Sequence, residues 1–237
     1  MRDPDLGVRA RGGRPSVEVL GTISLICTGW FLASVVLLHL IDPADPVGHQ
    51  ISEYALGPSG WVMTVAFLVV GAGIVALGLG LRRSLTPGPR VWAAWLITVC
   101  GVSFVGLAVF PTDAPLADGT TVGTFSGQMH ALTSTVGPLF LVVAAFVLRG
   151  VFARDPRWHP LARVTGWFGV AMVLWFVIGG TIGAVFGQGS YTGVVQRLFW
   201  LVLLGWLTVI GARLRRLGAA PTAAPVAPAM TAAAAAG

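Results

Sequence analysis

Long apolar segments separated by short polar loops fill most of the chain. Six segments have this character, at residues 17–40, 61–81, 91–110, 130–148, 164–186 and 193–210. An α-helix needs about 20 mostly apolar residues to cross the hydrocarbon core of a bilayer. The pattern therefore predicts an all-α membrane protein, a bundle of six transmembrane helices without a soluble domain.

The composition excludes an ordinary soluble domain. Hydrophobic residues make up 55% of the 237 positions and charged residues only 10%, whereas soluble domains carry about 25% charged residues. With so few charges, a soluble fold would leave too much apolar surface in contact with water. In a membrane, lipid covers that surface, so the bilayer itself is the first partner that the sequence predicts.

Arginine is distributed very unevenly between the predicted loops. All 15 basic residues are Arg, and all but Arg197 lie before the first segment, between the second and third, between the fourth and fifth, or after the sixth. Basic loops are retained on the cytoplasmic side of a membrane. The distribution predicts a multi-pass protein of the cell membrane with both termini in the cytoplasm. Since these Arg residues form short clusters and no basic face interleaved with aromatic residues, nucleic-acid binding is not predicted.

The two ends of the chain differ from its middle. Residues 1–16 and the Ala- and Pro-rich residues 217–237 have no apolar face to bury, so both are predicted to be disordered cytoplasmic tails. The transmembrane domain is accordingly assigned to residues 17–216. Its first segment exceeds the roughly 7 to 15 apolar residues of a signal peptide and lacks a small-x-small cleavage site, which favours a retained helix.

Glycine is frequent inside the apolar segments. Gly179, Gly183 and Gly187 follow one another at a spacing of four on the fifth segment and form a row of small residues. Small residues let helix backbones approach closely within a membrane. Packing within one chain and a dimer contact both explain the row, and the sequence leaves the oligomeric state open.

The candidate chemistry lies in and beside the loops that lack Arg. Asp113 follows the third segment, and His130 begins the fourth. A carboxylate at the depth of His130 would fix the tautomer of the imidazole, which suits acid–base catalysis. Ser134 lies one helical turn after His130 on the same face. Glu53 is the third candidate catalytic group, either feeding this site from an interfacial turn or lying in a solvated loop.

Arg197 is the exception among the basic residues, because it opens an apolar segment on the Arg-poor side. A charge inside a membrane costs about 3 kcal/mol on insertion scales and usually has a partner. Two explanations are open: Arg197 pairs with Glu53 or Asp113, or its side chain extends to the lipid headgroups. Four side chains on this side form the predicted set of binding residues: Ser52, Ser134, Gln196 and Arg197.

Neither a metal nor a cofactor is predicted. His39, Glu53, Asp113 and His130 carry donor atoms that suit a metal, but they lack the short helical spacing, such as His-Glu-x-x-His, that brings donors together. The two cysteines lie inside apolar segments without ligand spacing, so they are predicted to be inert buried thiols.

Four short motifs on the Arg-poor side occur in a characteristic order. They are Ile-Ser-Glu-Tyr-Ala-Leu-Gly-Pro at 51–58, Phe-Pro-Thr-Asp at 110–113, Gly-x-x-His at 127–130 and Gln-Arg at 196–197. With this combination the chain resembles, over residues 17–215, the family called domain of unknown function 998, bacterial membrane proteins of about six helices. The resemblance implies the membrane fold and no established activity. It draws attention to Ser52, Asp113, His130 and Arg197.

Two classes of function fit these residues. The first is a lipid- or isoprenoid-binding site at the outer membrane face, which as an enzyme would apply His130 and Asp113 to a lipid substrate; it predicts a lipid-sized cavity. The second is a non-catalytic sensor or partner subunit, in which the polar groups lock helix ends together; it predicts a packed cluster without a cavity. Transport is disfavoured, because the second, third and fifth segments have almost no ionisable group at mid-depth.

Overall fold

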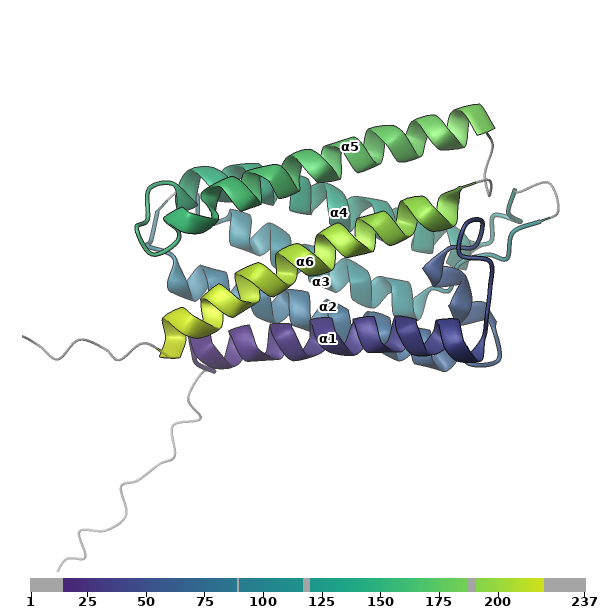
Figure 1. The fold of residues 1–237 in the computed structure, drawn as a ribbon, viewed down its shortest axis with the longest axis horizontal. Helices are drawn as coiled ribbons and strands as arrows, with labels where there is room; N and C mark the ends of the chain where they lie inside the picture. Colours follow the sequence, from purple (N-terminus) through teal and green to yellow (C-terminus); the bar gives the residue numbers. More distant parts are fainter. Residues whose placement is uncertain (1–14, 89, 117–119, 187–190, 220–237) are drawn as a thin grey trace, which may run out of the picture.

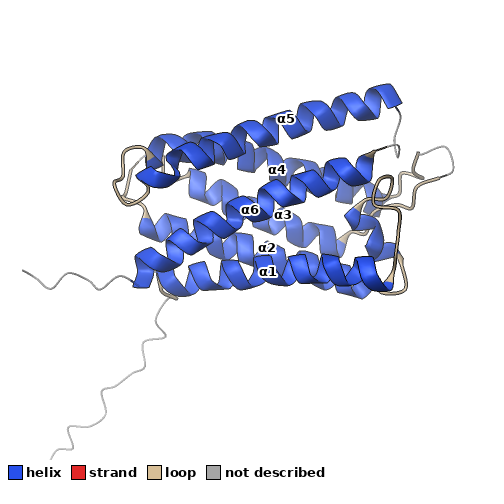
Figure 2. Cartoon of the chain, viewed as in Figure 1, coloured by secondary structure: helices blue, strands red, loops and turns tan. Residues whose placement is uncertain are grey.

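The computed structural model describes residues 15–88, 90–116, 120–186 and 191–219. Two short 3₁₀ helices, η1 (Ile51–Leu56) and η2 (His159–Leu161), accompany the main helices. Within these ranges the chain is helical and contains no strand (Figure 2). The main helices are α1 (Val17–Ile41), α2 (Gly60–Ser84), α3 (Ala93–Val109), α4 (Phe125–Phe152), α5 (Ala162–Phe186) and α6 (Thr192–Ala219).

The helices have the length and surface of membrane helices. Five of them (α1, α2, α4, α5 and α6) are long and apolar enough to cross a bilayer, and α3 is a shorter apolar helix of 17 residues. Large apolar side chains cover the outside of the bundle: Leu201 is 70% exposed, Ile26 65% and Val102 59%. A surface of this kind is stable in lipid, so the predicted all-α membrane fold is confirmed.

The helices pack side by side in a closed ring. Each helix contacts the next one in the sequence, α6 returns to α1, and α6 also contacts α2 across the ring (Figure 1). The start of α1 lies against the end of α6. We call this the Arg-rich end, which also holds residues 85–88, 90–92 and 153–161. The opposite, Arg-poor end holds residues 42–59, 110–116 and 120–124 and the start of α6.

The backbones of α2 and α3 approach closely where two glycines face each other. A Cβ on Gly71 of α2 would lie 2.8 Å from the carbonyl oxygen of Gly101 on α3, and a Cβ on Gly101 would lie 2.7 Å from that of Gly71. A residue larger than glycine at either position would therefore collide with the facing helix. Lipid tails are as apolar as a helix surface, so close packing of small residues is what holds such helices together.

Aromatic rings fill the centre of the ring of helices. Trp200 of α6 stacks on Phe31 of α1 with centroids 4.1 Å apart, and it meets Phe104 of α3 edge-on at 5.3 Å. Phe67 of α2 is 6.2 Å from the same indole. Since Trp200 contacts three other helices, it fixes the depth of α6 in the bundle.

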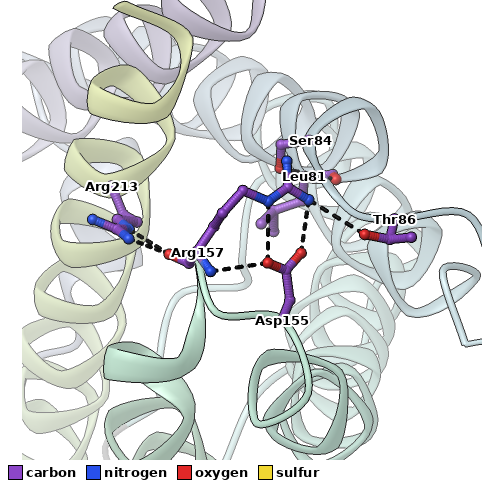
Figure 3. Close-up of polar contacts among 6 residues, drawn as sticks. All are labelled: Leu81, Ser84, Thr86, Asp155, Arg157 and Arg213. Atoms are coloured by element: carbon purple, nitrogen blue, oxygen red, sulfur yellow. Dashed lines mark hydrogen bonds and ion pairs between the residues drawn. The ribbon is translucent and has the colours of Figure 1, made fainter. Parts of the chain in front are cut away.

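An ion pair ties the loops together at the Arg-rich end. The Arg157 guanidinium donates to both carboxylate oxygens of Asp155, at 3.1 and 2.7 Å, and reaches the Thr86 hydroxyl at 3.4 Å. Arg213 of α6 donates to the Arg157 carbonyl, as Figure 3 shows. The adjacent guanidinium holds the pKa of the Asp155 carboxyl below its usual range. This cluster joins the α2–α3 loop, the α4–α5 loop and α6.

Several helix ends differ from the sequence-based boundaries, and the two largest differences are at the start of α4 and the end of α6. The fourth helix begins at Phe125, before the expected residue 130, because the Thr124 hydroxyl accepts a hydrogen bond from the Gly127 N–H and caps the helix. The sixth helix continues to Ala219, past the expected residue 210. The predicted disordered tails fall mostly on residues 1–14 and 220–237, outside the described residues.

Replacing Gly101 by Leu is expected to destabilise the protein by about 1 to 3 kcal/mol, because the side chain would overpack the α2–α3 contact. Thermal unfolding in detergent measures the effect. Gly205→Leu is the matched control, since a Cβ at Gly205 meets nothing within 4 Å. Equal melting temperatures for the two variants would show that the glycine contact does not hold α2 on α3.

Candidate functional site

The loop between α1 and η1 caps the N-terminus of α6. The Val47 carbonyl accepts hydrogen bonds from the Gly193 and Val194 N–H groups at 3.0 and 3.3 Å. The Thr192 hydroxyl donates to the Gly48 carbonyl at 2.9 Å. The first N–H groups of a helix have no partner within the helix, and at this helix the loop supplies carbonyl acceptors.

Arg197 extends the same contact one turn further along α6. Its Nη1 donates to the carbonyl oxygens of Pro46, His49 and Gly193, at 2.8, 2.7 and 3.0 Å. The loop can come this close only because residue 193 is glycine: a Cβ there would lie 2.4 Å from the His49 oxygen and 2.5 Å from the Pro46 oxygen. The guanidinium therefore binds the α1–η1 loop to α6.

His39 of α1 completes the coordination of Arg197. The His39 Nδ1 lies 2.7 Å from the Val35 carbonyl, which can only accept, so Nδ1 carries the proton. The Nε2 atom is then an acceptor, and it lies 3.3 Å from Nε and 3.0 Å from Nη2 of Arg197. A neutral histidine thus joins α1 to α6 through the guanidinium.

The prediction that Arg197 pairs with Glu53 or Asp113 is wrong. The ion pair among the described residues lies at the Arg-rich end, and the recorded partners of Arg197 are carbonyl oxygens and an imidazole. Its charge acts on Asp45 from a distance: the pKa of this carboxyl is lowered mainly by two backbone N–H groups and, to a smaller extent, by Arg197. Backbone acceptors from a loop have no signature in the sequence, so neither of the two explanations for Arg197, an ion pair or the lipid headgroups, included them.

Asp113 orders the start of α4. Its carboxylate accepts hydrogen bonds from the Thr124 hydroxyl and from the Thr124 and Gly123 N–H groups, the last two at 2.9 Å. The Thr124 hydroxyl contributes most to lowering the pKa of this carboxyl. The carboxylate also lies against the Cα of Gly127. Asp113 makes no hydrogen bond with His130, so the expected His–Asp pair is not formed.

Glu53 and Gln196 hold the short helix η1 in place. Glu53 accepts a hydrogen bond from the Gln50 N–H at 3.2 Å, within η1 itself. The Gln196 side chain of α6 accepts from the Ile51 N–H and donates to the Gln50 amide oxygen at 3.2 Å and the Ser52 hydroxyl at 3.5 Å. Through Gln196, η1 is attached to α6 with Ser52 buried, at 2% exposed.

His130 is buried, at 6% exposed, and its two ring nitrogens have different surroundings. Nδ1 lies 2.8 Å from the Phe110 carbonyl and must donate to it. Nε2 has no hydrogen bond in the described residues, yet it is not among their fully enclosed unpartnered atoms, which belong to Ser24, Tyr54 and Trp158. It therefore keeps accessible surface, and His130 is one of the residues that line a cavity at the Arg-poor end.

A cavity of about 410 Å³ lies at the Arg-poor end between η1 and helices α2 to α6. Its lining combines apolar, mostly aromatic walls with polar side chains that carry no formal charge. The apolar lining consists of Phe67, Phe104, Leu107, Trp175, Phe176, Gly179, Gly180, Ile182, Val195, Phe199 and Trp200. The polar lining consists of Gln50, Ser52, His130, Ser134, Thr135, Thr192 and Gln196.

The structure divides the predicted site residues into two groups. His130, Ser52, Ser134 and Gln196 line the cavity, whereas Glu53, Asp113 and Arg197 do not. The Ser134 hydroxyl donates to the Ala131 carbonyl of its own helix at 3.0 Å and makes no hydrogen bond to His130. The groups that bear charge therefore serve helix ends and loops, and the uncharged groups form the cavity.

Sequence reasoning missed the aromatic walls. On α6, Thr192, Val195, Gln196, Phe199 and Trp200 follow the helical spacing of one face, and all line the cavity. The helical spacing of these residues around Gln196 could have identified the aromatic wall on α6 from the sequence. On α5, Gly179 belongs to the glycine row that the sequence explains by helix packing or by a dimer contact; it lines the cavity and lies close to α6. Gly187 of the same row lies outside the described residues.

The described residues contain no group of three or more His, Cys, Asp or Glu side chains that could hold a metal ion. A second cavity, of about 780 Å³, opens at the Arg-rich end and differs in charge from the first. Its lining includes Arg90, Arg154 and Arg157 with Asp155. The two ends of the bundle thus offer a charged crevice and an uncharged cavity.

The fold and the cavity define an α-helical, multi-pass membrane protein. A family model described as "Protein of unknown function (DUF998)" matches residues 25–213. The match covers most of the chain, so the protein belongs to this family, and the resemblance noted from the four motifs is confirmed. Searches of the curated proteins and of the solved structures give no match. Evidence for function therefore comes from the cavity itself.

Replacing Arg197 by Ala is expected to lower stability by on the order of 3 kcal/mol, because hydrogen bonds to a charged group contribute about 1.5–3 kcal/mol each and the loop acceptors lose their donor. Arg197→Lys should recover only part of the lost stability, since one ammonium cannot reach both the loop carbonyls and His39. Thermal unfolding in detergent is the measurement, with Arg216→Ala on the same helix as control. Equal effects of the two alanine variants would contradict the clamp.

Replacing Asp113 by Asn is expected to destabilise the protein at neutral pH. The difference in stability from wild type should become smaller at acidic pH. The folded-state pKa of Asp113 is lowered, so its ionised form stabilises the fold above the ordinary carboxyl range of about 4, and this stabilisation is lost as the pH falls through the folded-state pKa. Melting temperatures of wild type and Asp113→Asn between pH 3 and pH 7 should converge at the acid end. A pH-independent difference would show that ionisation of Asp113 is irrelevant.

Proposed function

We propose that this membrane protein binds a lipid or isoprenoid in the cavity at its Arg-poor end. The observation that carries the proposal is the cavity itself: its volume of about 410 Å³, its aromatic walls and its few uncharged polar groups. Ligand sites commonly combine apolar walls with a small number of polar groups that orient the ligand. A membrane ligand suits this site because the surrounding helices are embedded in lipid.

The proposal includes six membrane crossings with both termini in the cytoplasm. The shorter α3 spans about 26 Å at 1.5 Å per residue, and hydrogen bonds from Val91 to Gly88 and from Ala93 to Arg90 precede it as a further turn. The apolar run is thereby continuous over most of a bilayer. The Arg distribution supports an orientation in the cell membrane with the Arg-rich end on the cytoplasmic side and the cavity in the outer leaflet.

The enzyme alternative, in which His130, Asp113 and Glu53 perform acid–base chemistry on a lipid, has weaker support. Both carboxylates accept backbone hydrogen bonds outside the cavity lining, which leaves His130 without an acidic partner. Of the three predicted catalytic residues, only His130 lines the cavity, and its Nε2 is accessible. A single imidazole can bind a ligand, but without a carboxylate beside it no charged partner stabilises the imidazolium that forms during acid–base catalysis.

The alternative of a non-catalytic sensor or partner subunit explains a different part of the molecule. That hypothesis expects polar groups that lock helix ends, and Arg197, Asp113 and Gln196 fit this description. It also expects a filled cluster, and the cavity beside Gln196 speaks against that. A sensor that binds a ligand would combine the locked helix ends with the open cavity. It would differ from a protein that only binds the lipid in responding to that binding.

Replacing Gly180 by Leu is expected to reduce lipid retention by about tenfold, a loss of about 1.4 kcal/mol in binding. Gly180 lines the cavity, and a Cβ there meets nothing within 4 Å, so the side chain should take up ligand space while the fold is retained. Native mass spectrometry of the detergent-purified protein detects the retained lipid. Gly205→Leu is the matched control, and equal retention in the two variants would argue against the cavity as the binding site.

The topology is tested with single cysteines on the two sides of α3. In a chain carrying Cys27→Ala and Cys100→Ala, we expect an impermeant maleimide to label Thr121→Cys on intact cells and Pro87→Cys only after lysis. A green fluorescent protein fused after the last residue should fluoresce, because it folds in the cytoplasm. Labelling of both cysteines from the same side would rule out a crossing by α3.

A further inference from the structure

The lining of the Arg-poor cavity contains no ionised side chain within the described residues. Three charged groups described near the cavity have other partners: Arg197 binds loop carbonyls and His39, Asp113 binds the start of α4, and Glu53 accepts from the Gln50 N–H. An ionised ligand group would enter a space with aromatic walls and no counter-charge among the described residues, and burying an unpaired charge is strongly unfavourable. The cavity therefore selects against phosphates, carboxylates and ammonium groups.

His130 determines which uncharged group the cavity accepts. Because its Nδ1 donates to the Phe110 carbonyl at 2.8 Å, the Nε2 of the neutral ring has a lone pair and no proton. Nε2 is accessible and has no partner in the described part of the chain. A ligand completes this site by donating a hydrogen bond, which a hydroxyl can do and an ester or ketone oxygen cannot.

The other polar groups of the lining leave room for the same ligand group. The Ser52 hydroxyl accepts from Gln196 at 3.5 Å, but no acceptor for its own proton is recorded among the described residues. Ser134 donates to its own helix and keeps its acceptor lone pairs. A hydroxyl can both donate and accept, so it matches a lining that offers an acceptor at His130 Nε2 and at Ser134 and a donor at Ser52.

We infer that the cavity binds an uncharged amphiphile with a hydroxyl head, the hydroxyl donating to His130 Nε2 and the apolar body lying among the aromatic walls. The inference rests on the proposed function, because it specifies the ligand of the same cavity. Two ligand sources share this chemistry, a diacylglycerol-type lipid and an isoprenoid alcohol. Phosphorylated forms of either are excluded for lack of a cation in the lining.

The test uses two matched pairs of probes with the full chain in detergent. One pair is dioctanoylglycerol and dioctanoyl phosphatidic acid; the other is farnesol and farnesyl monophosphate. Each pair differs only by the phosphate. Quenching of tryptophan fluorescence reports binding, since Trp175 and Trp200 line the cavity. At least one alcohol should bind about tenfold more tightly than its phosphate, equivalent to about 1.4 kcal/mol, and the pair that responds identifies the source.

His130→Asn isolates the contribution of Nε2. The Asn amide can still donate to the Phe110 carbonyl, as Nδ1 does, but nothing replaces Nε2. We expect alcohol binding to weaken about five- to tenfold, the effect of losing one hydrogen bond, while phosphate binding and the melting temperature stay close to wild type. Ser52→Ala should weaken alcohol binding less than His130→Asn does, because the variant keeps His130 Nε2 as the acceptor for the ligand hydroxyl.

The outcomes separate this inference from the proposed function. If a phosphate binds as tightly as its alcohol, or if His130→Asn leaves alcohol binding unchanged, the hydroxyl assignment is overturned while the lipid-binding cavity stands. If no probe quenches the fluorescence and Gly180→Leu also leaves lipid retention unchanged, both proposals fail. Selective alcohol binding that depends on His130 and is blocked by Gly180→Leu supports both.

Discussion

The Arg-poor end depends on one set of contacts, the binding of the 42–50 loop carbonyls by the N-terminus of α6 and by Arg197. A helix N-terminus within a membrane fold has N–H groups that need acceptors, and this loop satisfies them together with the guanidinium. Because the loop leads directly into η1, its attachment also sets the position of Ser52. Gly193 makes the arrangement possible, since a side chain there would push the loop away.

A consequence of these contacts is that charge is kept out of the cavity. Arg197 and Asp113 belong to the site that the sequence predicts. In the structure, each side chain binds backbone groups at a helix end instead. The second cavity, at the Arg-rich end, is lined by charged side chains that include the Asp155–Arg157 ion pair. A bundle with charge at one end and an uncharged aromatic cavity at the other suits the binding of an amphiphile that carries no charge.

His130 connects the structural and the chemical features of the molecule. The carbonyl of Phe110, at the point where α3 ends, holds the Nδ1 proton in the position that was expected for a carboxylate. A carbonyl fixes the tautomer as well as a carboxylate does, but it cannot stabilise an imidazolium by charge. The same residue therefore fits a hydrogen-bond acceptor for a ligand better than a general base.

The sequence by itself determined the membrane class, the approximate helix segments and the family, because apolar run length, Arg placement and motif order are all local properties of the chain. It also identified His130, Ser52, Ser134 and Gln196, which line the cavity. Only the tertiary structure decided the partners of Arg197 and Asp113 and revealed the aromatic walls on α5 and α6. The physical reason is that backbone carbonyls and apolar side chains from distant segments acquire a function only when packing brings them together.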